Sequence, residues 1–199
     1  MRRLLLPLAM LASLAAAPLA AQVRYYAGLG VNGATALIKD QVVTPIEIRQ
    51  KIAPALVLGA GLPVGQRYGV GLELVGTSGG THSEENGIRL DLGTLRTVSA
   101  TVGLEGPLPG SLRWRGSLGL LKYFPANKQG VFLRGGPRMF IGGLGVEYRR
   151  PWKHRLDFTA GTRYEFHRFT TDELKARGFT GSQDVHRLTF LLAIARTSR

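Results

Sequence analysis

Residues 156–166 read LDFTAGTRYEF, and apolar and polar side chains alternate along most of this stretch. One parity carries apolar side chains, namely Leu156, Phe158, Ala160, Tyr164 and Phe166. The other parity carries polar or small residues, namely Asp157, Thr159, Gly161, Arg163 and Glu165. A period of two residues is that of a β-strand whose two faces meet different surroundings. The stretch therefore predicts a strand with one apolar face and one face of small or polar residues.

The same alternation recurs in seven other segments, at residues 23–31, 52–62, 68–75, 88–105, 112–120, 140–149 and 187–194. Helical periodicity is nearly absent, so the chain is expected to be all-β. In the segment 88–105, the predicted apolar face holds Ile88, Leu90, Leu92 and Val98, and Arg96 interrupts it. The long stem of an arginine allows its charge to reach toward lipid head groups, which is the interpretation we give to Arg96.

The connections between these segments alternate in length. In chain order they are long (32–50), short (63–67), medium (78–87), short (106–111), long (122–138), short (150–154) and long (170–184). Prolines suit tight turns, and four of them fall in the short connections, at positions 63, 107, 109 and 151. Short turns on one rim and longer loops on the other are typical of transmembrane barrels. The sequence therefore predicts an eight-stranded antiparallel up-and-down transmembrane β-barrel with its long loops outside the cell.

The N-terminus has the pattern of a secretory signal peptide. Arg2 and Arg3 precede an apolar run, and small residues follow up to Ala21. We predict a signal peptide over residues 1–21 and a barrel domain over residues 22–199; Pro7 and Pro18 disfavour the alternative of a membrane anchor. Cleavage would lower the formal net charge from +13 to +11. A basic exported chain favours lipopolysaccharide phosphates over nucleic acid as its anionic partner.

The composition of the two faces indicates which one meets lipid. The non-apolar face is mostly Gly, Ala, Ser and Thr, which fit the crowded interior of a barrel of about eight strands. A soluble ligand-binding barrel would instead carry a charged outer face and an apolar interior. We therefore expect the large apolar residues to face lipid, with aromatic girdles at both edges of the apolar band. The girdle residues are Tyr25, Tyr68, Trp114 and Tyr148 beside the short turns, and Phe140, Tyr164 and Phe166 beside the long loops.

Charged residues on the non-apolar face are expected to form a network in the lumen. The residues are Glu73, Glu105, Glu147, Glu165, Arg113, Arg115, Arg149 and Arg163. Glu105 and Arg113 flank one short turn, so we predict that they pair across neighbouring strands. Such a network can act as a plug that neutralises buried charge, or it can line a narrow pore. The small lumen of an eight-stranded barrel favours the plug.

Two short motifs suggest enzymes and lack the surroundings that those enzymes need. Gly28, Gly30 and Gly33 match a dinucleotide-binding pattern, but no helix is expected after them. Ser78 lies in a G-x-S-x-G pattern, and with His167 it would suit an envelope lipid hydrolase of the lipid A type. The histidines lack metal-ligand spacing. We therefore predict no catalytic, cofactor or metal site.

The signal peptide, the alternating strands over 23–196 and the alternating loop lengths together resemble the small outer-membrane β-barrel families, the OmpA-like transmembrane domain and the OmpX-like proteins. The resemblance implies an integral outer-membrane protein, inserted by the barrel assembly machinery and functioning as a monomer. The chain departs from the family pattern at its C-terminus, which reads ARTSR rather than ending in an aromatic residue. The expected function is non-catalytic, with surface loops for envelope structure, lipopolysaccharide or partner contact. A ligand-binding barrel and a narrow pore are the alternatives.

Overall fold

The computed structural model describes residues 22–40, 46–85, 87–153, 155–178 and 181–198. The predicted signal peptide, residues 1–21, lies outside the described residues. Strands dominate the fold: β1 (Arg24–Ala34), β2 (Ile38–Asp40), β3 (Ile46–Gln50), β4 (Ala53–Val64), β5 (Tyr68–Glu85), β6 (Ile88–Pro107), β7 (Leu112–Pro125), β8 (Arg138–Pro151), β9 (Leu156–Phe169) and β10 (Gln183–Thr197). Two short helices complete it, the 3-10 helix η1 (Gly130–Phe132) and the α-helix α2 (Asp172–Ala176).

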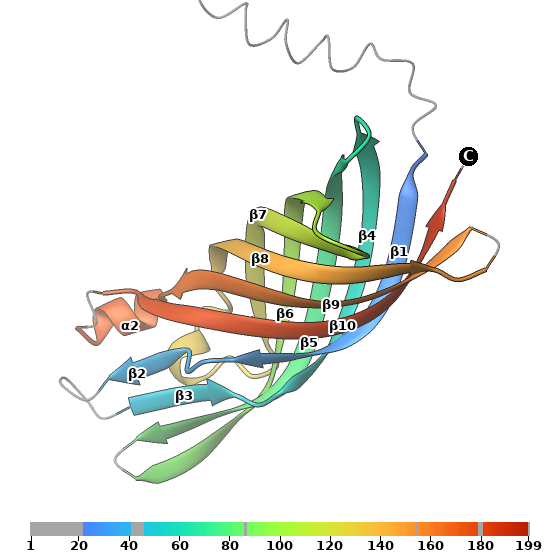
Figure 1. The fold of residues 1–199 in the computed structure, drawn as a ribbon. Helices are drawn as coiled ribbons and strands as arrows, with labels where there is room; N and C mark the ends of the chain where they lie inside the picture. The colour runs from blue at the N-terminus through green and yellow to red at the C-terminus, as the bar shows by residue number, and fades with distance from the viewer. Residues whose placement is uncertain (1–21, 41–45, 86, 154, 179–180, 199) are drawn as a thin grey trace, which may run out of the picture.

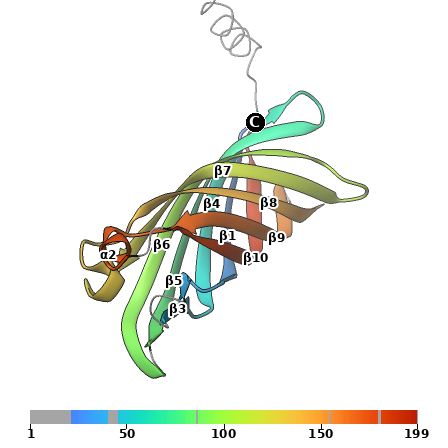
Figure 2. The ribbon, with the colours of Figure 1, turned by 90° about the vertical axis from the view of Figure 1, so that its left-hand side faces the viewer.

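Eight of the strands form a closed antiparallel ring (Figures 1 and 2). The order β5-β4-β1-β10-β9-β8-β7-β6 is closed by pairing of β5 with β6. The first and last strands of the ring, β1 and β10, pair over residues 24–34 and 187–197. The prediction of an eight-stranded up-and-down barrel is therefore confirmed. Within the described residues, no helix is long and apolar enough to cross a membrane.

The ring has two different ends. The turn end holds both described termini and the short connections at residues 65–67, at residues 108–111 and at residues 152, 153 and 155. The loop end holds η1, α2 and the connections that contain β2 and β3. Figure 1 shows α2, β2 and β3 gathered at one end of the ring and the C-terminus at the other.

Two of the connections predicted from sequence are strands over more than half of their length. Residues 32–50 contain the end of β1 and the strands β2 and β3, and residues 78–85 belong to β5. From the Gln50–Thr81 pair toward the loop end, β3 pairs with the part of β5 that extends past its pairing with β4. β6 pairs with the other edge of β5. The prediction of a medium loop over 78–87 was wrong, because strands on both sides supply the backbone partners that its small residues need. β5 and β6 are thus 18 and 20 residues long.

A bulge reverses the facing of residues at the start of β6. Thr81 pairs with Gly93 and His82 with Asp91, so Leu92 is an extra residue between them. Gly93 has a φ of +81°, and its N–H donates to the Asp91 carboxylate over 2.7 Å. The extra residue shifts the alternation: Leu90 pairs with the buried Ser83 on the inward parity of β5, whereas Val98 pairs with Gly76 on the outward parity, and Leu92 itself is buried. The prediction that Ile88, Leu90 and Leu92 share one face with Val98 was therefore wrong.

The ring encloses two chemically distinct layers. At the loop end, the interior is apolar and forms the main hydrophobic cluster, here called the apolar cap: Leu37, Ile38, Ile46, Ile48, Leu92, Leu95, Leu121, Tyr123, Val131, Phe132, Met139, Ile141, Phe169, Leu174 and Val185. Nearer the turn end, the buried side chains are mostly charged or hydroxylated. The outer wall is apolar over most strands, with Leu29, Leu118 and Phe140 exposed by 69%, 73% and 85%.

Candidate functional site in the barrel lumen

The charged layer begins at the turn end with Glu105 and Arg149. Arg149 on β8 donates to both carboxylate oxygens of Glu105 on β6, with its Nη1 2.8 Å from Oε1. Arg113 is farther from Glu105, with its Nε 3.7 Å from Oε1. The predicted pair of Glu105 and Arg113 is therefore present, and Arg149, one strand farther away, is the closer partner that the sequence analysis did not predict. Strand β7 separates β6 from β8, and the long Arg149 side chain spans that distance inside the curved wall.

A denser network lies deeper in the lumen, around Glu73 and Glu147. Arg163 contacts both carboxylates, with its Nη2 2.8 Å from Glu147 Oε1 and its Nη1 against Glu73. Arg149 also donates to Glu147, with its Nη2 2.8 Å from Oε2, which joins this network to Glu105. Buried carboxylates and guanidinium groups require such pairing, since each isolated charge would lose its hydration without compensation.

Tyr26 connects the network to the opposite wall. Its hydroxyl donates to Glu73 Oε2 over 2.7 Å and accepts from Arg115 Nη1 over 3.2 Å. Arg115 is almost fully buried, and its Nη2 lies 3.9 Å from Glu73. Glycines leave the space for these side chains: a Cβ at Gly103 would lie 3.0 Å from Arg115 Cζ, and one at Gly59 would overlap the Tyr26 ring. The small residues on the inward face therefore make room for large polar ones.

Within the same polar part of the interior, a further layer of contacts surrounds Arg187 on β10. Its Nη2 donates to Asn32 Oδ1 over 3.2 Å and to Thr97 Oγ1 over 3.0 Å. Among the described residues, no carboxylate lies within 4.0 Å of the Arg187 guanidinium nitrogens. Glu165 is buried and stands opposite Arg187 in the β9–β10 register, and within the same described ranges it also makes no ion pair within that distance. This layer is thus held mainly by neutral acceptors.

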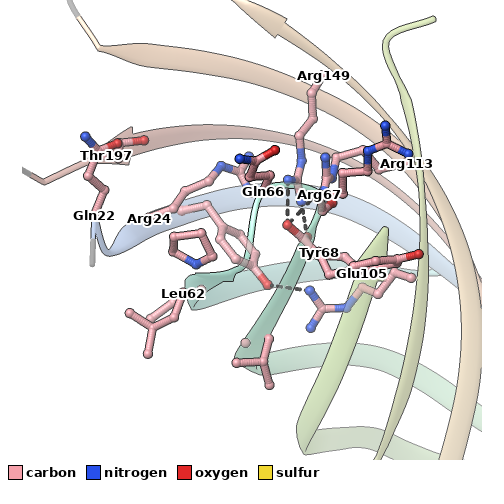
Figure 3. A pocket seen from close by; sticks show the side chains of 17 residues that line it. Gln22, Arg24, Leu62, Gln66, Arg67, Tyr68, Glu105, Arg113, Arg149 and Thr197 are labelled. Atoms are coloured by element: carbon pink, nitrogen blue, oxygen red, sulfur yellow. Dashed lines mark hydrogen bonds and ion pairs between the residues drawn. The ribbon is translucent and has the colours of Figure 1, made fainter. Parts of the chain in front are cut away.

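A cavity of about 240 Å³ opens between the charged layer and the turn end (Figure 3). Arg24, Arg113, Arg149 and Glu105 line it together with Tyr68 and the β4–β5 turn. Figure 3 shows the guanidinium groups of Arg113 and Arg149 converging on Glu105 from different strands. The charged layer therefore closes this cavity on its inner side.

The apolar cap begins with a buried pair of aromatic polar groups. The Tyr123 hydroxyl lies 2.6 Å from His167 Nε2, and Phe169 packs edge-on against the Tyr123 ring. His167 is 1% exposed inside the barrel, whereas Ser78 is exposed on the outer wall. The barrel wall thus separates the two residues that a hydrolase active site would need side by side. The described residues contain no group of three or more potential metal ligands.

The eight charged residues predicted for the lumen all lie on the inward parity of their strands, and Glu73, Arg115, Glu147, Arg163 and Glu165 are buried. Sequence reasoning missed Arg24, Tyr26 and Arg187. Arg24 donates to Thr159 on β9 and lies 3.8 Å from Asp157. The signal that could have found all three was present, since each alternates with an outward apolar residue in the same way as the residues that were chosen.

The predicted girdle residues lie on the outer wall. Tyr25, Tyr68, Tyr148, Phe140, Tyr164 and Phe166 are exposed. Trp114 is part-buried, because its indole lies against Gly106, its register partner in β6. The Tyr164 hydroxyl also contacts His186 Nδ1 at 2.5 Å. Their role at a membrane interface stays a prediction.

No family model matches the chain, and no curated protein matches it. Its fold is similar to solved structures. Neisserial surface protein A is 8% identical, with a TM-score of 0.58 over 88% of this chain and 97% of that chain. The chain has the fold of the small outer-membrane β-barrels. The chain is also similar to the outer-membrane protein OprG of Pseudomonas aeruginosa. OprG is 11% identical, with a TM-score of 0.53 over 90% of this chain and 96% of the OprG chain. At such identities the likeness extends to the fold alone.

Proposed function

We propose that the chain is an integral outer-membrane β-barrel without catalytic activity, whose loop-end surface contacts lipopolysaccharide or partner proteins. The observation that carries the proposal is the outer wall, where large apolar side chains are exposed on the strands of the ring. Soluble proteins rarely expose such extensive apolar surface, whereas a membrane barrel must present it to lipid. The predicted signal peptide is consistent with export. The barrel assembly machinery would insert the chain as a monomer.

Cell fractionation and gel mobility test this placement. The exported chain should pellet with the outer membrane, and it should migrate differently on a gel when it has not been boiled, because a closed barrel resists unfolding by detergent. Release in soluble form by osmotic shock would contradict the proposal and favour the soluble ligand-binding barrel.

We also propose that the lumen is a plug rather than a pore. The charged layer and the apolar cap occupy successive levels of the interior, and the cap includes residues of η1 and α2 as well as of the wall. In a planar bilayer, the purified barrel should therefore show no steady conductance. A steady current whose ion selectivity changes in the Glu105→Ala variant would contradict the plug and favour a narrow charged pore.

A further inference from the structure

Three cationic side chains lie next to one another on the outer wall near the loop end. They are Arg96 on β6, Lys122 on β7 and Arg138 on β8, which are neighbouring strands. Lys122 stands directly opposite Arg138 in the β7–β8 register. Lys122 is also opposite Val98, so Arg96 is its diagonal neighbour on β6. We call these three residues the cationic triad.

The register places like charges where they repel one another. Side chains directly opposite across an antiparallel pair have Cβ atoms about 5 Å apart, diagonal neighbours lie about 7–8 Å apart, and like charges there are destabilising. Among the described residues, no member of the triad forms an ion pair within 4.0 Å. Other loop-end cations do have carboxylates: Arg49 pairs with Glu47, Arg134 with Asp172 and Arg168 with Asp184. The triad, like Arg89 and Lys128 at the same end, lacks the counter-charge that these three cations have, and within the triad the unpaired charges also lie beside one another.

The triad lies at the edge of the apolar wall. Lys122 follows Trp114 by eight residues on the same strand. With a rise of about 3.4 Å per residue and a tilt of about 40°, that spacing corresponds to about 20 Å along the barrel axis. The apolar band of such barrels is about 25 Å tall, so the triad stands near its loop-side edge. The Lys122 ammonium lies 5.2 Å from the centre of the Phe124 ring, which keeps its charge against the wall.

An apolar groove lies on the turn-end side of Arg96 and Lys122, on the strands that carry them and on β4 and β5. Its volume is about 690 Å³, and it runs over β4, β5, β6 and β7. Ala100 and Leu120 line it and face each other in the register, one outward pair below Val98 and Lys122. The small side chain of Ala100 leaves the wall hollow between Leu118, Leu120 and Val102. Cationic groups thus border an apolar depression on one face of the barrel.

We propose that Arg96, Lys122 and Arg138 bind the phosphate groups of lipid A, the phosphorylated and multiply acylated anchor of lipopolysaccharide, and that an acyl chain lies in the groove below them. The inference rests on the proposed function, because it requires the loop end to lie in the outer leaflet. Arginine binds phosphate through paired N–H donors, and lysine binds it as a point charge. Two phosphates shared among three cations would supply the missing counter-charge. A membrane-facing set of cations beside acyl chains is the arrangement expected for an anionic head group.

The first test measures thermal stability with and without phosphorylated lipid. Because the charges of the triad repel one another, replacing Lys122 should change stability differently in the two conditions. In a neutral detergent without phosphorylated lipid, Lys122→Gln should raise the temperature at which the unboiled band is lost, because it removes the central like charge. With purified bisphosphoryl lipid A present, the same variant should gain less thermal stability than the wild type. A lysine that served only to hold the wall together would lower stability in both conditions, and that result would contradict the inference.

The second test measures affinity by native mass spectrometry of the detergent-solubilised barrel. The triple variant R96Q/K122Q/R138Q should bind bisphosphoryl lipid A at least about tenfold more weakly than the wild type. The matched control R150Q/K153Q/R155Q removes the same charge at the turn end and should keep its affinity. Monophosphoryl lipid A should bind the wild type more weakly than the bisphosphoryl form.

The outcomes separate this inference from the proposed function. Equal lipid A affinity for the wild type and the triad variant, in barrels that show the heat-dependent gel shift, would overturn the inference alone. Equal binding of phosphatidylglycerol would also overturn it, since the site would then be specific for phospholipid. A wild-type chain that forms no detergent-resistant barrel and inserts into no bilayer would overturn the proposed function and this inference together.

Discussion

At the residue scale, Glu147 joins the two parts of the lumen network. It accepts from Arg149 and from Arg163, and its own side chain is almost fully buried. Removing one member of a buried ion pair leaves an uncompensated charge, which costs more than losing an exposed pair. The contrast between Glu147 and a carboxylate nearer to solvent, such as Glu47, is therefore informative.

Glu147→Ala should lower the free energy of unfolding by about 3 kcal/mol, because Arg163 then lacks one of its two carboxylates. The matched control Glu47→Ala breaks an exposed pair with Arg49 and should cost less than about 1 kcal/mol. Urea unfolding of the barrel in lipid vesicles, followed by the gel shift, measures both. Similar small losses for the two variants would indicate a hydrated lumen rather than a dry plug.

Pairing between Glu105 and Arg149 can be separated from pairing with Arg113. A double-mutant cycle for Glu105→Ala with Arg149→Ala should give a coupling free energy of about 1–2 kcal/mol. The cycle with Arg113→Ala should give a smaller coupling, because the Arg113 contact is longer. Larger coupling to Arg113 would make Arg113, rather than Arg149, the principal partner of Glu105.

Gly119 tests the close approach of strands inside the wall. A Cβ there would lie 2.7 Å from Thr101 Cα on β6, whereas a Cβ at Gly76 would meet nothing within 4 Å. Gly119→Ala should lower the free energy of unfolding by about 1–3 kcal/mol, because strand backbone must shift. Gly76→Ala is the control and should be tolerated, and urea unfolding compares the two. Equal stability of both variants would mean that the wall relaxes freely around position 119.

At the scale of elements, α2 acts as part of the apolar cap. Thr171 caps its N-terminus by accepting from the Leu174 N–H over 3.2 Å, and Leu174 itself is buried in the cap. Glu173 Oε1 accepts from the backbone N–H of Arg134, which ties α2 to the β7–β8 connection over 2.8 Å. Slight burial raises the pKa of Glu173, but hydrogen bonds from its own backbone N–H and that of Arg134 outweigh it, so the pKa lies below its usual value.

The lowered pKa of Glu173 predicts that the contact between α2 and the β7–β8 connection depends on pH. A carboxyl group with a depressed pKa in the folded state stabilises that state above its ordinary pKa of 4.5, and the contribution is lost as the pH falls through the folded value. Amide hydrogen exchange at Arg134 should therefore quicken, relative to the intrinsic rate, between about pH 6 and about pH 3. Glu173→Gln should remove most of this change. A change of the same size in that variant would assign it to another group.

The elements also show how far the sequence determines the fold. Alternation alone predicts the ring strands, because the wall separates two environments along nearly its whole height. It fails at Leu92, where the bulge at Gly93 adds one residue and reverses the facing. It also fails to predict the apolar cap: Leu121, Met139 and Ile141 occupy the inward parity, which was expected to be small or polar.

The sequence predicts which charged residues belong to the lumen network, but it does not predict which residue is the closest partner of each. Inward parity identifies residues such as Glu73, Glu105 and Arg163 from the sequence. The partners depend on the relative heights of eight strands around the ring, and a long side chain can pass over a neighbouring strand, as Arg149 does to reach Glu105. Sequence distance carries no information about that height.

At the scale of the whole molecule, the two ends of the barrel should face different compartments. A short epitope inserted after Lys128, between β7 and β8, should be accessible to antibody on intact cells, as should one in the β9–β10 connection. An epitope inserted between Pro107 and Gly110 should be accessible only after the outer membrane is permeabilised. The reverse pattern would invert the orientation and place the cationic triad in the inner leaflet.

The seam between β1 and β10 has a consequence for how the barrel is assembled. The first and last strands of the ring pair with each other, and the Ser198 N–H reaches the Val23 carbonyl over 2.8 Å beside them. Until that seam closes, every partial sheet has two unpaired edges that can capture other chains, so assembly needs protection from aggregation. Because residues 22 and 198 lie at the same end, a circular permutant joined there by a short linker and opened after Lys128 should still form a heat-modifiable barrel in detergent. In cells, β7 would then be the final strand presented for insertion. A permutant that refolds in the test tube and yet accumulates unassembled in the periplasm would separate what the fold requires from what delivery to the membrane requires.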